Sequence, residues 1–370
     1  MRIAHIVAYL SERGEYGGPL SVATAQAAAL AQRGNRVDLY TGWDGKAEAR
    51  VPGVGVYARR AYRLGRSKSF ATLFSPSLMA CLIRSLHKYD VVHLHLSRDL
   101  LTFPAAILCR IMGKRVVIQT HGMVKPDKRI LSRLSDIPMK AIFRNAAAHL
   151  YLTDAEADNL RELSPRQHNL MRVPNGLAER SEQAVWPQDD HPEVLYCGRI
   201  HPRKRVPEFV AMAERLLSGY VKARFTIVGP DGGDLENVRN QIAASPYRNA
   251  ISYEGAVAPG SVASRLRKAQ VCVLPSENEP FPMAVLEAMS VGLPVVVTES
   301  NGLASSLRKA DPAFVTGHSA EELSLSVQEI LSSADRWALA AMRSRDAVRR
   351  DFNIRAVCDL LETIYAEANL

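Results

Sequence analysis

The sequence predicts an α/β protein made of two Rossmann-like, doubly wound parallel-sheet domains that face a central cleft. Three observations point to this fold class. The chain has 370 residues, roughly 2.5 times a 150-residue domain. Short β-branched runs alternate with helix-like stretches, which is typical of parallel sheets covered by helices on both faces. One polar, proline-containing stretch interrupts the alternation, so we expect the chain to divide there.

The expected strands are short apolar runs bounded by turn residues. They fall at residues 3–9, 37–40, 91–96, 116–119 and 150–152 in the first half, and at residues 194–197, 224–228, 250–253, 271–274 and 294–297 in the second. Helices are expected between them, for example at residues 20–33, where alanine and leucine dominate, and at residues 208–217.

The break in this alternation lies at residues 181–192 (SEQAVWPQDDHP), which are polar, contain two prolines and show no hydrophobic period. They are interpreted as a linker between an N-terminal domain, residues 1–180, and a C-terminal domain, residues 193–352. The last segment, 353–370, is amphipathic and can pack on either domain. Its apolar face is expected to hold Val357, Leu360, Leu361 and Ile364.

Composition narrows the class of protein. Hydrophobic residues make up 47% and charged residues 23%, which excludes wholesale disorder and fibrous repeats. No apolar run approaches the ~20 residues of a membrane-spanning helix, and the N-terminus reads as a strand and not as a signal peptide, so we expect a cytoplasmic protein. The five cysteines lie far apart without a CxxC pair, which argues against disulfide scaffolds and zinc modules. The net charge of +9 favours either anionic partners or a solvated basic surface.

The strongest chemical signal is the segment at residues 276–292, SENEPFPMAVLEAMSVG, which follows a buried strand and leads into a helix. Pro282 fits the first helical turn, and a helix start attracts anions and oxygen acceptors. The amides expected to point out of this helix start belong to Met283, Ala284 and Val285. Glu279 and Glu287, eight residues apart, could both bind hydroxyl groups of one ligand. Alternatively, Glu279 only complements the helix dipole and Glu287 lies on the helix surface.

The second signal is CGRIHPRKR, at the end of the strand that opens the second half. Arg199 and Lys204 lie five residues apart in a proline-containing loop, with Arg203 and Arg205 beside them. A guanidinium and an ammonium group at the mouth of a sheet can clamp a diphosphate. A solvated basic loop is the alternative.

Further signals lie at other strand ends. Gly17 and Gly18 follow the first strand and either allow close approach of a ligand or form a plain turn; GEYGGP lacks the nicotinamide-cofactor pattern. His121, in QTHG, follows a strand and can donate to a sugar hydroxyl or a backbone acceptor, or stabilise developing positive charge through a carbonyl that it orients. A satisfied loop histidine is the equal alternative. His93 and His95 share a strand face; packing is the favoured interpretation, because no third metal ligand is evident.

Two more strand ends are supportive. Gly229 lies in VGPDGG, a glycine loop that lets the backbone approach a ligand, and Val257 follows ISYEGA near where a nucleobase would stack.

Taken together, these residues resemble the retaining GT-B glycosyltransferases of family 4 (glycosyl transferases group 1). The resemblance covers nearly the whole chain. Its most specific parts are E-x7-E, from Glu279 to Glu287, and G-R-x4-K, from Gly198 to Lys204. The order of GG loop, THG, VPNG, GR…K, VG, EGAV and E-x7-E also matches.

The resemblance implies a nucleotide-diphosphate sugar donor (a UDP- or GDP-sugar), held mostly by the C-terminal domain, and a metal-independent retaining transfer of a hexose. Arg199 and Lys204 would grip the diphosphate, Glu287 the ribose and Glu279 the sugar, while the amides after Phe281 would hold sugar or phosphate oxygens. Gly17 and Gly18 would approach the phosphate, and His121 the transferred sugar. The terminal segment would cross back onto the N-terminal domain.

Two positions depart from the family pattern. Pro282 replaces the glycine of E-x-F-G and removes one amide donor, and Arg205 replaces a glycine that often follows the lysine, which is expected to add charge beside the clamp.

The resemblance also implies a glycan or lipid-linked acceptor in polysaccharide or glycoconjugate biosynthesis. Basic residues of the first half are candidates for peripheral contact with an anionic membrane, at the inner face of the plasma membrane. They are Arg59, Arg60, Arg63, Arg66, Lys68, Lys125, Lys128 and Arg129. The alternatives are a nucleotide-sugar epimerase of the same architecture and a non-catalytic sugar-nucleotide-binding subunit. Nucleic-acid binding is not expected, because no aromatic residues interleave the basic runs.

Overall fold

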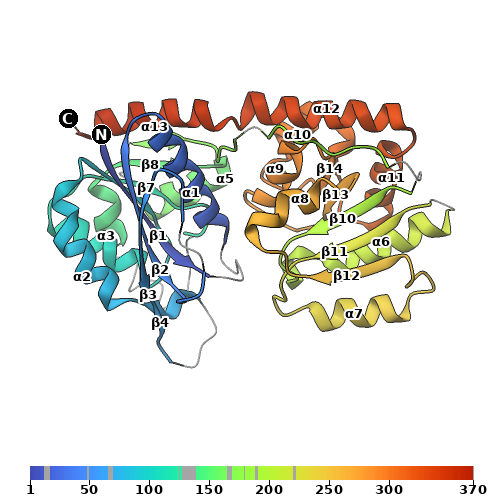
Figure 1. Ribbon diagram of the computed structural model, residues 1–370, viewed down its shortest axis with the longest axis horizontal. Helices are drawn as coiled ribbons and strands as arrows, with labels where there is room; N and C mark the ends of the chain where they lie inside the picture. Colours follow the sequence, from blue (N-terminus) through green and yellow to red (C-terminus); the bar gives the residue numbers. More distant parts are fainter. Residues whose placement is uncertain are drawn as a thin grey trace. The chain divides into compact units, whose positions relative to one another are not determined.

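The structure is a computed structural model that describes residues 1–11, 17–47, 50–65, 70–124, 126, 139–164, 169–178, 180–187, 191–219 and 222–369. The chain divides into two compact units (Figure 1). Met1–Gly176 and Ile354–Leu370 form unit 1, and Leu177–Asn353 form unit 2. Each unit is built on one parallel sheet, so the predicted class of two Rossmann-like domains is confirmed.

Unit 1 contains a seven-stranded sheet in the order β3-β2-β1-β6-β7-β8-β9, and every adjacent pair is parallel. Its strands are β1 (Arg2–Leu10), β2 (Arg36–Trp43), β3 (Gly55–Arg60), β6 (Val91–His95), β7 (Val116–Gln119), β8 (Ala146–Tyr151) and β9 (Leu170–Arg172). The central strands β6 and β7 are buried along their whole length, as expected for a sheet covered on both faces. A small antiparallel pair, β4 (Tyr62–Arg63) with β5 (Leu73–Phe74), lies outside this sheet.

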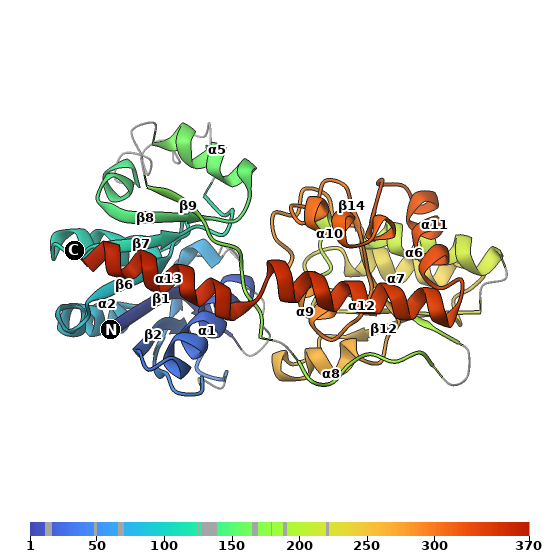
Figure 2. The same cartoon turned by 90° about the horizontal axis from the view of Figure 1, so that it is seen from above.

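The helices of unit 1 cover both faces of this sheet. They are α1 (Gly17–Gln32), α2 (Pro76–Ser85), α3 (Thr102–Ile111), α5 (Asp154–Leu163) and α13 (Ile354–Asn369), with short 3-10 turns η1 (Phe70–Thr72) and η2 (Leu86–Lys88). Apolar residues of α2, α3 and α5 share one core, and those of α1 and α13 share another. Figure 2 shows α13 running along the sheet beside α1.

Unit 2 contains a six-stranded parallel sheet in the order β12-β11-β10-β13-β14-β15. In sequence order this is 3-2-1-4-5-6, the strand order of a Rossmann sheet. Its strands are β10 (Glu193–Cys197), β11 (Arg224–Val228), β12 (Ile251–Gly255), β13 (Val271–Leu274), β14 (Val295–Thr298) and β15 (Val315–Thr316).

The helices of unit 2 share a single core with this sheet. They are α6 (Val206–Ser218), α7 (Leu235–Ala244), α8 (Val262–Leu266), α9 (Met283–Ser290), α10 (Ala304–Ala310), α11 (Ala320–Ile330) and α12 (Ala334–Asp351), with η3 (Pro202–Lys204), η4 (Pro259–Ser261) and η5 (Pro312–Phe314). Local sequence sets their starts: Ser319 caps α11 and exchanges hydrogen bonds with Glu322 in a capping box.

The segment predicted as a linker packs against unit 2. The Ala184 amide donates to the Val291 carbonyl at 2.7 Å, and the Val185 carbonyl accepts from the Gln270 side chain at 2.8 Å. The Trp186 ring lies 5.8 Å from that of Trp337, centroid to centroid. The residues Ala184, Val185 and Trp186 thus contact unit 2, although the segment as a whole is polar and was therefore predicted as a linker. The division lies earlier, between Gly176 and Leu177; residues 188–190 fall outside the described residues.

The terminal helix α13 belongs to unit 1 and buries a stripe of its surface there. Val357, Leu361 and Ile364 are buried, but Leu360 is 46% exposed, so its predicted place on the apolar face is wrong. The stripe instead includes Tyr365, because residues three and four apart share a helix face.

Candidate functional site

The two strongest motifs meet at the carboxyl edge of the unit 2 sheet. Strands β10 and β13 are neighbours and are the first and fourth strands of the 3-2-1-4-5-6 order. Between these two strands lies the topological switch point, and open α/β sheets bind ligands outside it. The loops that follow the two strands carry Lys204 and Glu279. The fold therefore places both motifs where a ligand site is expected.

Lys204 and Glu279 form an ion pair. The Lys204 Nζ lies 2.8 Å from Glu279 Oε2, and the two side chains are only 17% and 12% exposed. Arg203 Nη2 lies farther away, at 3.7 Å, and its side chain is 53% exposed. Burial lowers the pKa of Lys204, and the charge of Glu279 opposes this shift. Lys204 is thus a partly desolvated cation, whose interaction with a bound anion is weakly screened.

Backbone hydrogen bonds hold the two loops together. The Glu277 amide donates to the Arg203 carbonyl at 3.1 Å, and the Gly302 amide donates to the Glu279 carbonyl at 2.8 Å. Asn278, just before the glutamate, adopts a left-handed conformation with φ 51°, and its amide donates to Ser300 Oγ at 3.0 Å. These bonds fix the backbone on which the Lys204–Glu279 pair depends.

Arg205 does not add charge to this pair, contrary to expectation. Its guanidinium donates to Glu208 Oε1 at 3.0 Å, one turn into α6. Its backbone has φ 52° and ψ 43°, in the left-handed region. Glycine adopts this conformation without strain, which explains why a glycine suits the position after the lysine.

The start of α9 differs from the prediction in three respects. Pro282 is the N-cap residue, with ψ 105°, and lies before the first helical turn. The Val285 amide donates to the Pro282 carbonyl at 3.1 Å, so this amide is not available to a ligand. The Phe281 ring packs edge-on against Phe352 at 5.9 Å, so its side chain anchors the loop. Met283 and Ala284, half-buried at the helix start, are the remaining predicted positions there.

The charges of both glutamates act on residues at the end of β10. Burial, together with the charge of Glu287, raises the pKa of the Cys197 thiol to about 12. Burial and the charge of Glu279 raise the pKa of Tyr196 well above its ordinary value. Glu287 is half-buried and thus not an exposed residue on the outer surface of α9. The two acids of E-x7-E therefore act on adjacent residues of one strand end.

The glycine loop after β11 interlocks with the loop after β10. Gly229 has φ 148°, and a Cβ built there would lie 1.8 Å from the Gly198 carbonyl oxygen. A Cβ on Gly232 would lie 2.7 Å from Cγ and Cδ of Arg199. The Ile200 amide donates to the Pro230 carbonyl at 2.9 Å. These contacts place Arg199 against the glycine loop.

Val257 follows β12, the edge strand, and its half-buried side chain packs against the unit 2 core. Near it, the Tyr253 hydroxyl donates to the Gly229 carbonyl at 3.0 Å. Tyr253, four residues before Val257, thus contacts the glycine loop.

Three buried polar atoms near the ion pair lack hydrogen-bond partners among the described residues. They are Ser276 Oγ, Glu279 Oε2 and Asn301 Nδ2. The contact from Lys204 to Glu279 Oε2 has the distance of an ion pair without hydrogen-bonding angles. Buried polar atoms are usually satisfied, so this group is suited to a polar ligand. Sequence reasoning missed Ser276 and Asn301 as site residues; their position directly after strands was the available signal.

The carboxyl edge of unit 1 carries the remaining predicted residues. Gly17 and Gly18 form the first turn of α1 and not a loop before it, because α1 starts three residues earlier than predicted. A Cβ added to Gly18 meets no atom within 4 Å among the described residues, so its surroundings are open.

His121 follows β7 with φ 52°, and its Nε2 lies 2.8 Å from Nδ1 of His95. Buried Glu156, which sequence reasoning missed, fastens this loop by accepting from the Gly122 amide at 2.6 Å and from the Leu152 amide at 2.8 Å.

The basic residues of the first half are only partly described. Arg66, Lys68, Lys125, Lys128 and Arg129 lie outside the described residues. Arg59 is half-buried and Arg60 exposed. A cavity of about 500 Å³ in unit 1 is lined by several cations, among them Arg2, Arg36, Arg59, Arg84 and Lys88. In the part of the chain that is described, no helix combines the length and the apolar character needed to cross a bilayer.

Two families match adjoining parts of the chain. Residues 179–346 match "Glycosyl transferases group 1", and residues 16–179 match "Glycosyltransferase Family 4". The chain belongs to the GT-B glycosyltransferases of the family 4 type. The resemblance carried by E-x7-E and G-R-x4-K is thereby confirmed, and the protein is a glycosyltransferase of group 1.

Relatives of this glycosyltransferase have varied names. Alpha-D-kanosaminyltransferase of Streptomyces kanamyceticus is 25% identical over 284 residues, which cover 71% of this chain and 73% of that protein. D-inositol 3-phosphate glycosyltransferase of Pseudarthrobacter chlorophenolicus is 25% identical, covering 84% of this chain and 80% of its own.

Solved structures share the fold of this glycosyltransferase. Anabaena HepE in complex with UDP and glucose has a TM-score of 0.75 at 15% identity, covering 98% of this chain and 99% of its own. Sucrose-phosphate synthase from Thermosynechococcus elongatus has a TM-score of 0.76 at 21% identity, and the match covers 99% of this chain and 98% of that protein.

Proposed function

We propose that this enzyme transfers a hexose from a UDP- or GDP-sugar to a hydroxyl group of a glycan or lipid-linked acceptor, with retention of anomeric configuration and without a metal ion. The observation that carries the proposal is the Lys204–Glu279 ion pair at the switch point of unit 2, where Glu279 Oε2 is buried without a hydrogen-bond partner among the described residues. A half-buried cation for phosphate and a neighbouring carboxylate for sugar hydroxyls suit a sugar diphosphate. HepE, which shares the fold, has been solved with UDP and with UDP-glucose.

In this proposal each residue has a separate role. Lys204 and Arg199 hold the diphosphate, Glu287 accepts from the ribose hydroxyls and Glu279 from the sugar hydroxyls. Amides at the start of α9 bind sugar or phosphate oxygens. Gly229 and Val257 adjoin the nucleotide, Gly17 and Gly18 approach the phosphate, and His121 contacts the transferred sugar.

The chemical step is the departure of the nucleotide diphosphate from an oxocarbenium-like sugar. The bond from the anomeric carbon to the phosphate oxygen breaks, and the electron pair leaves with the diphosphate. Lys204 and Arg199 stabilise that developing charge, the effect that commonly contributes most to such a barrier. The acceptor hydroxyl then attacks from the same face, while the leaving phosphate takes its proton. The cations thus do the work that a divalent ion would do, and the sequence places no D-x-D pair to bind one.

The acceptor is proposed from the positive charge of unit 1. The cations that line its cavity suit a phosphate-bearing or anionic partner, including a membrane surface. Cosedimentation with vesicles containing anionic lipid, lost at high salt, supports this part, and equal binding to neutral vesicles contradicts it.

A panel of UDP-, GDP- and ADP-sugars tests the reaction type. We expect release of the nucleotide diphosphate from one of them, even without acceptor, because water can replace the acceptor slowly. Conversion to an epimer without release would instead indicate an epimerase. Binding without turnover of any donor would indicate a non-catalytic subunit.

Pro282 provides a prediction about donor affinity. Restoring the amide with Pro282→Gly is expected to lower the KM for the donor about 2–10-fold, because a net hydrogen bond is worth about 0.5–1.5 kcal/mol. Pro280→Gly is the matched control, since it loosens the same loop but places its amide two residues earlier. A KM that is unchanged or raised in Pro282→Gly would mean that no ligand oxygen lies at that position.

A further inference from the structure

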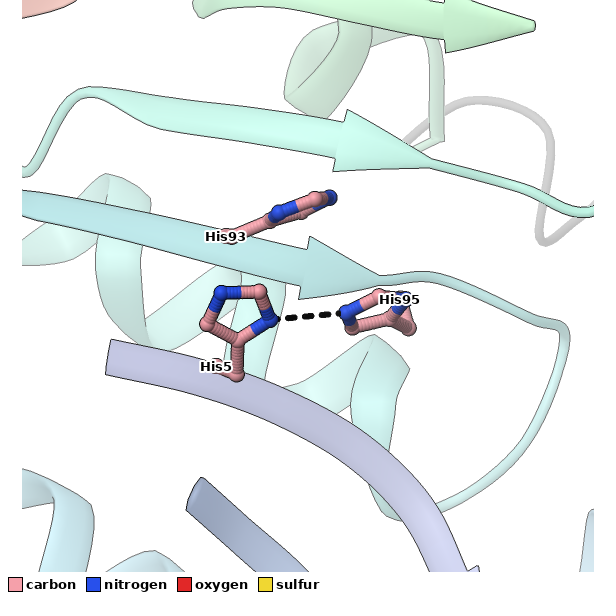
Figure 3. Close-up of side chains that lie close together, drawn as sticks. All are labelled: His5, His93 and His95. Carbon is pink, nitrogen blue, oxygen red and sulfur yellow. Dashed lines mark hydrogen bonds between the residues drawn. The ribbon is translucent and has the colours of Figure 1, made fainter. Parts of the chain in front are cut away.

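Three histidines of unit 1 lie close together inside the sheet that carries His121 at its carboxyl edge. His5 on β1 pairs in register with His93 on β6, and His95 lies two residues further along β6 on the same face. All three are at most 1% exposed. Figure 3 shows their rings, with a hydrogen bond of 3.1 Å between His5 Nδ1 and His95 Nε2. His5 is therefore the third histidine beside His93 and His95, and it comes from a strand distant in the sequence.

This group has the composition of a metal site, but its geometry does not suit one. Its candidate ligand nitrogens lie within 4.8 Å of one another, so their distances alone allow a metal ion, but the directions of the rings do not. The rings of His93 and His95 are stacked, with centroids 4.5 Å apart and planes at 16°. Lone pairs in nearly parallel stacked rings run side by side and do not converge on one ion. The observed contacts favour hydrogen bonding.

The hydrogen bonds form a chain that ends at His121. His95 Nε2 contacts His5, and His95 Nδ1 lies 2.8 Å from Nε2 of His121. The chain crosses β1, β6 and the end of β7, which are adjacent in the sheet. It therefore connects the interior of unit 1 with the loop residue at its carboxyl edge.

The number of protons determines the direction of this chain. Burial lowers the pKa of His5, His95 and His121 below the ordinary value, so each ring is neutral at pH 7 and carries one N–H. His95 must then donate through one nitrogen and accept through the other. If protons pointed toward His5, its N–H would lie on Nε2, which is buried without a partner among the described residues. Buried N–H groups without acceptors are rare, so the protons point toward His121.

We propose that His5 and His95 are positioning residues that hold His121 as the Nδ1–H tautomer, so that His121 offers a hydrogen-bond donor at the carboxyl edge of unit 1. In this arrangement His5 Nδ1–H donates to His95 Nε2, and His95 Nδ1–H donates to His121 Nε2. The Nδ1–H of His121 then remains to donate to an oxygen of a ligand. That this ligand is the transferred sugar rests on the proposed function; the tautomer does not.

The tautomer can be measured in the wild-type protein. With ¹⁵N-labelled histidine, long-range ¹H–¹⁵N spectra distinguish a protonated Nδ1 from a protonated Nε2, and the His121→Gln variant assigns the signals of His121. We expect protonated Nδ1 and bare Nε2 at pH 7.5. Protonated Nε2, or a mixture of tautomers, would overturn the proposal. So would an equimolar bound metal that is lost in His5→Phe.

Kinetics test what the chain does for the reaction. In His95→Phe we expect kcat for donor hydrolysis to fall about 10–100-fold, the range seen when the hydrogen-bond partner that orients a metal-bound histidine is removed. The donor KM should change less than about threefold, because donor binding depends mostly on unit 2 in the proposed function. His95→Gln should recover most of the loss, since its amide both accepts and donates. A kcat of His95→Gln as low as that of His95→Phe would contradict a hydrogen-bonding role.

His93→Phe is the matched control, because it removes a buried imidazole from the same strand and face without interrupting the chain to His121. It should keep kcat within about threefold and leave the His121 tautomer unchanged; an equal loss in both variants would mean that packing alone matters. If the wild type turns over no sugar nucleotide, the proposed function fails, whereas the spectra still decide the tautomer.

Discussion

Replacing Lys204 with alanine is expected to lower kcat for the sugar-nucleotide donor about 10²–10³-fold, the loss seen when one preorganised donor to developing charge is removed. The Lys204 side chain is only 17% exposed, so water replaces its ammonium group poorly. Release of nucleotide diphosphate at saturating donor measures the effect. Near-normal turnover would mean that Lys204 does not stabilise the leaving group.

A double-mutant cycle with Glu279→Gln distinguishes an action of Lys204 on the diphosphate from its ion pair with Glu279. If Lys204 acts on the diphosphate, Lys204→Ala should still lower kcat strongly in the Glu279→Gln background. If Lys204 only neutralises Glu279, its loss should have little effect once the acid is gone. Lys268→Ala, at an exposed position of unit 2 outside these loops, is the control and should retain full activity.

The strands that the sequence predicted best are central ones. β7, β11 and β13 have the predicted bounds. A strand buried on both faces is a nearly continuous apolar run, and β11 adds one exposed residue, Arg224, at its start. β3, β9 and β15 were not predicted. They lie at or near sheet edges, and β9 and β15 have three and two residues. Such short segments are strands because they hydrogen-bond to a neighbouring strand, and the local residue types do not predict this pairing.

The candidate site could be predicted where a motif lies on one loop. Arg199, Lys204, Glu279 and Glu287 follow strands whose ends were predicted, and the strand order brings these loops together. The pairing of Arg205 with Glu208 and the packing of Phe281 depend on side-chain directions that spacing does not determine. His5 was missed because it resembles any core strand residue until β1 and β6 are known to be in register.

Gly229→Ala is expected to have the largest effect on stability. The added Cβ would lie 1.8 Å from the Gly198 carbonyl oxygen and 2.6 Å from its carbon, both backbone atoms, at a φ of 148°. The clash and the backbone strain together should cost about 3 kcal/mol or more. For a unit of this size that lowers the Tm by roughly 6–12 °C. Because Gly198 precedes Arg199, the shift should also disturb the diphosphate clamp and lower turnover.

Alanine variants at two other glycines distinguish the effect of backbone strain from that of a steric clash. An added Cβ meets no atom within 4 Å among the described residues at Gly233, where φ is 105°, or at Gly260, where no unusual φ applies. Gly260→Ala should leave the Tm nearly unchanged, and Gly233→Ala should lower it by an intermediate amount through strain alone. A Tm for Gly229→Ala equal to that of Gly233→Ala would show that the loops after β10 and β11 are not in contact. Contacts with the glycine loop would then not hold Arg199 in position to bind the diphosphate.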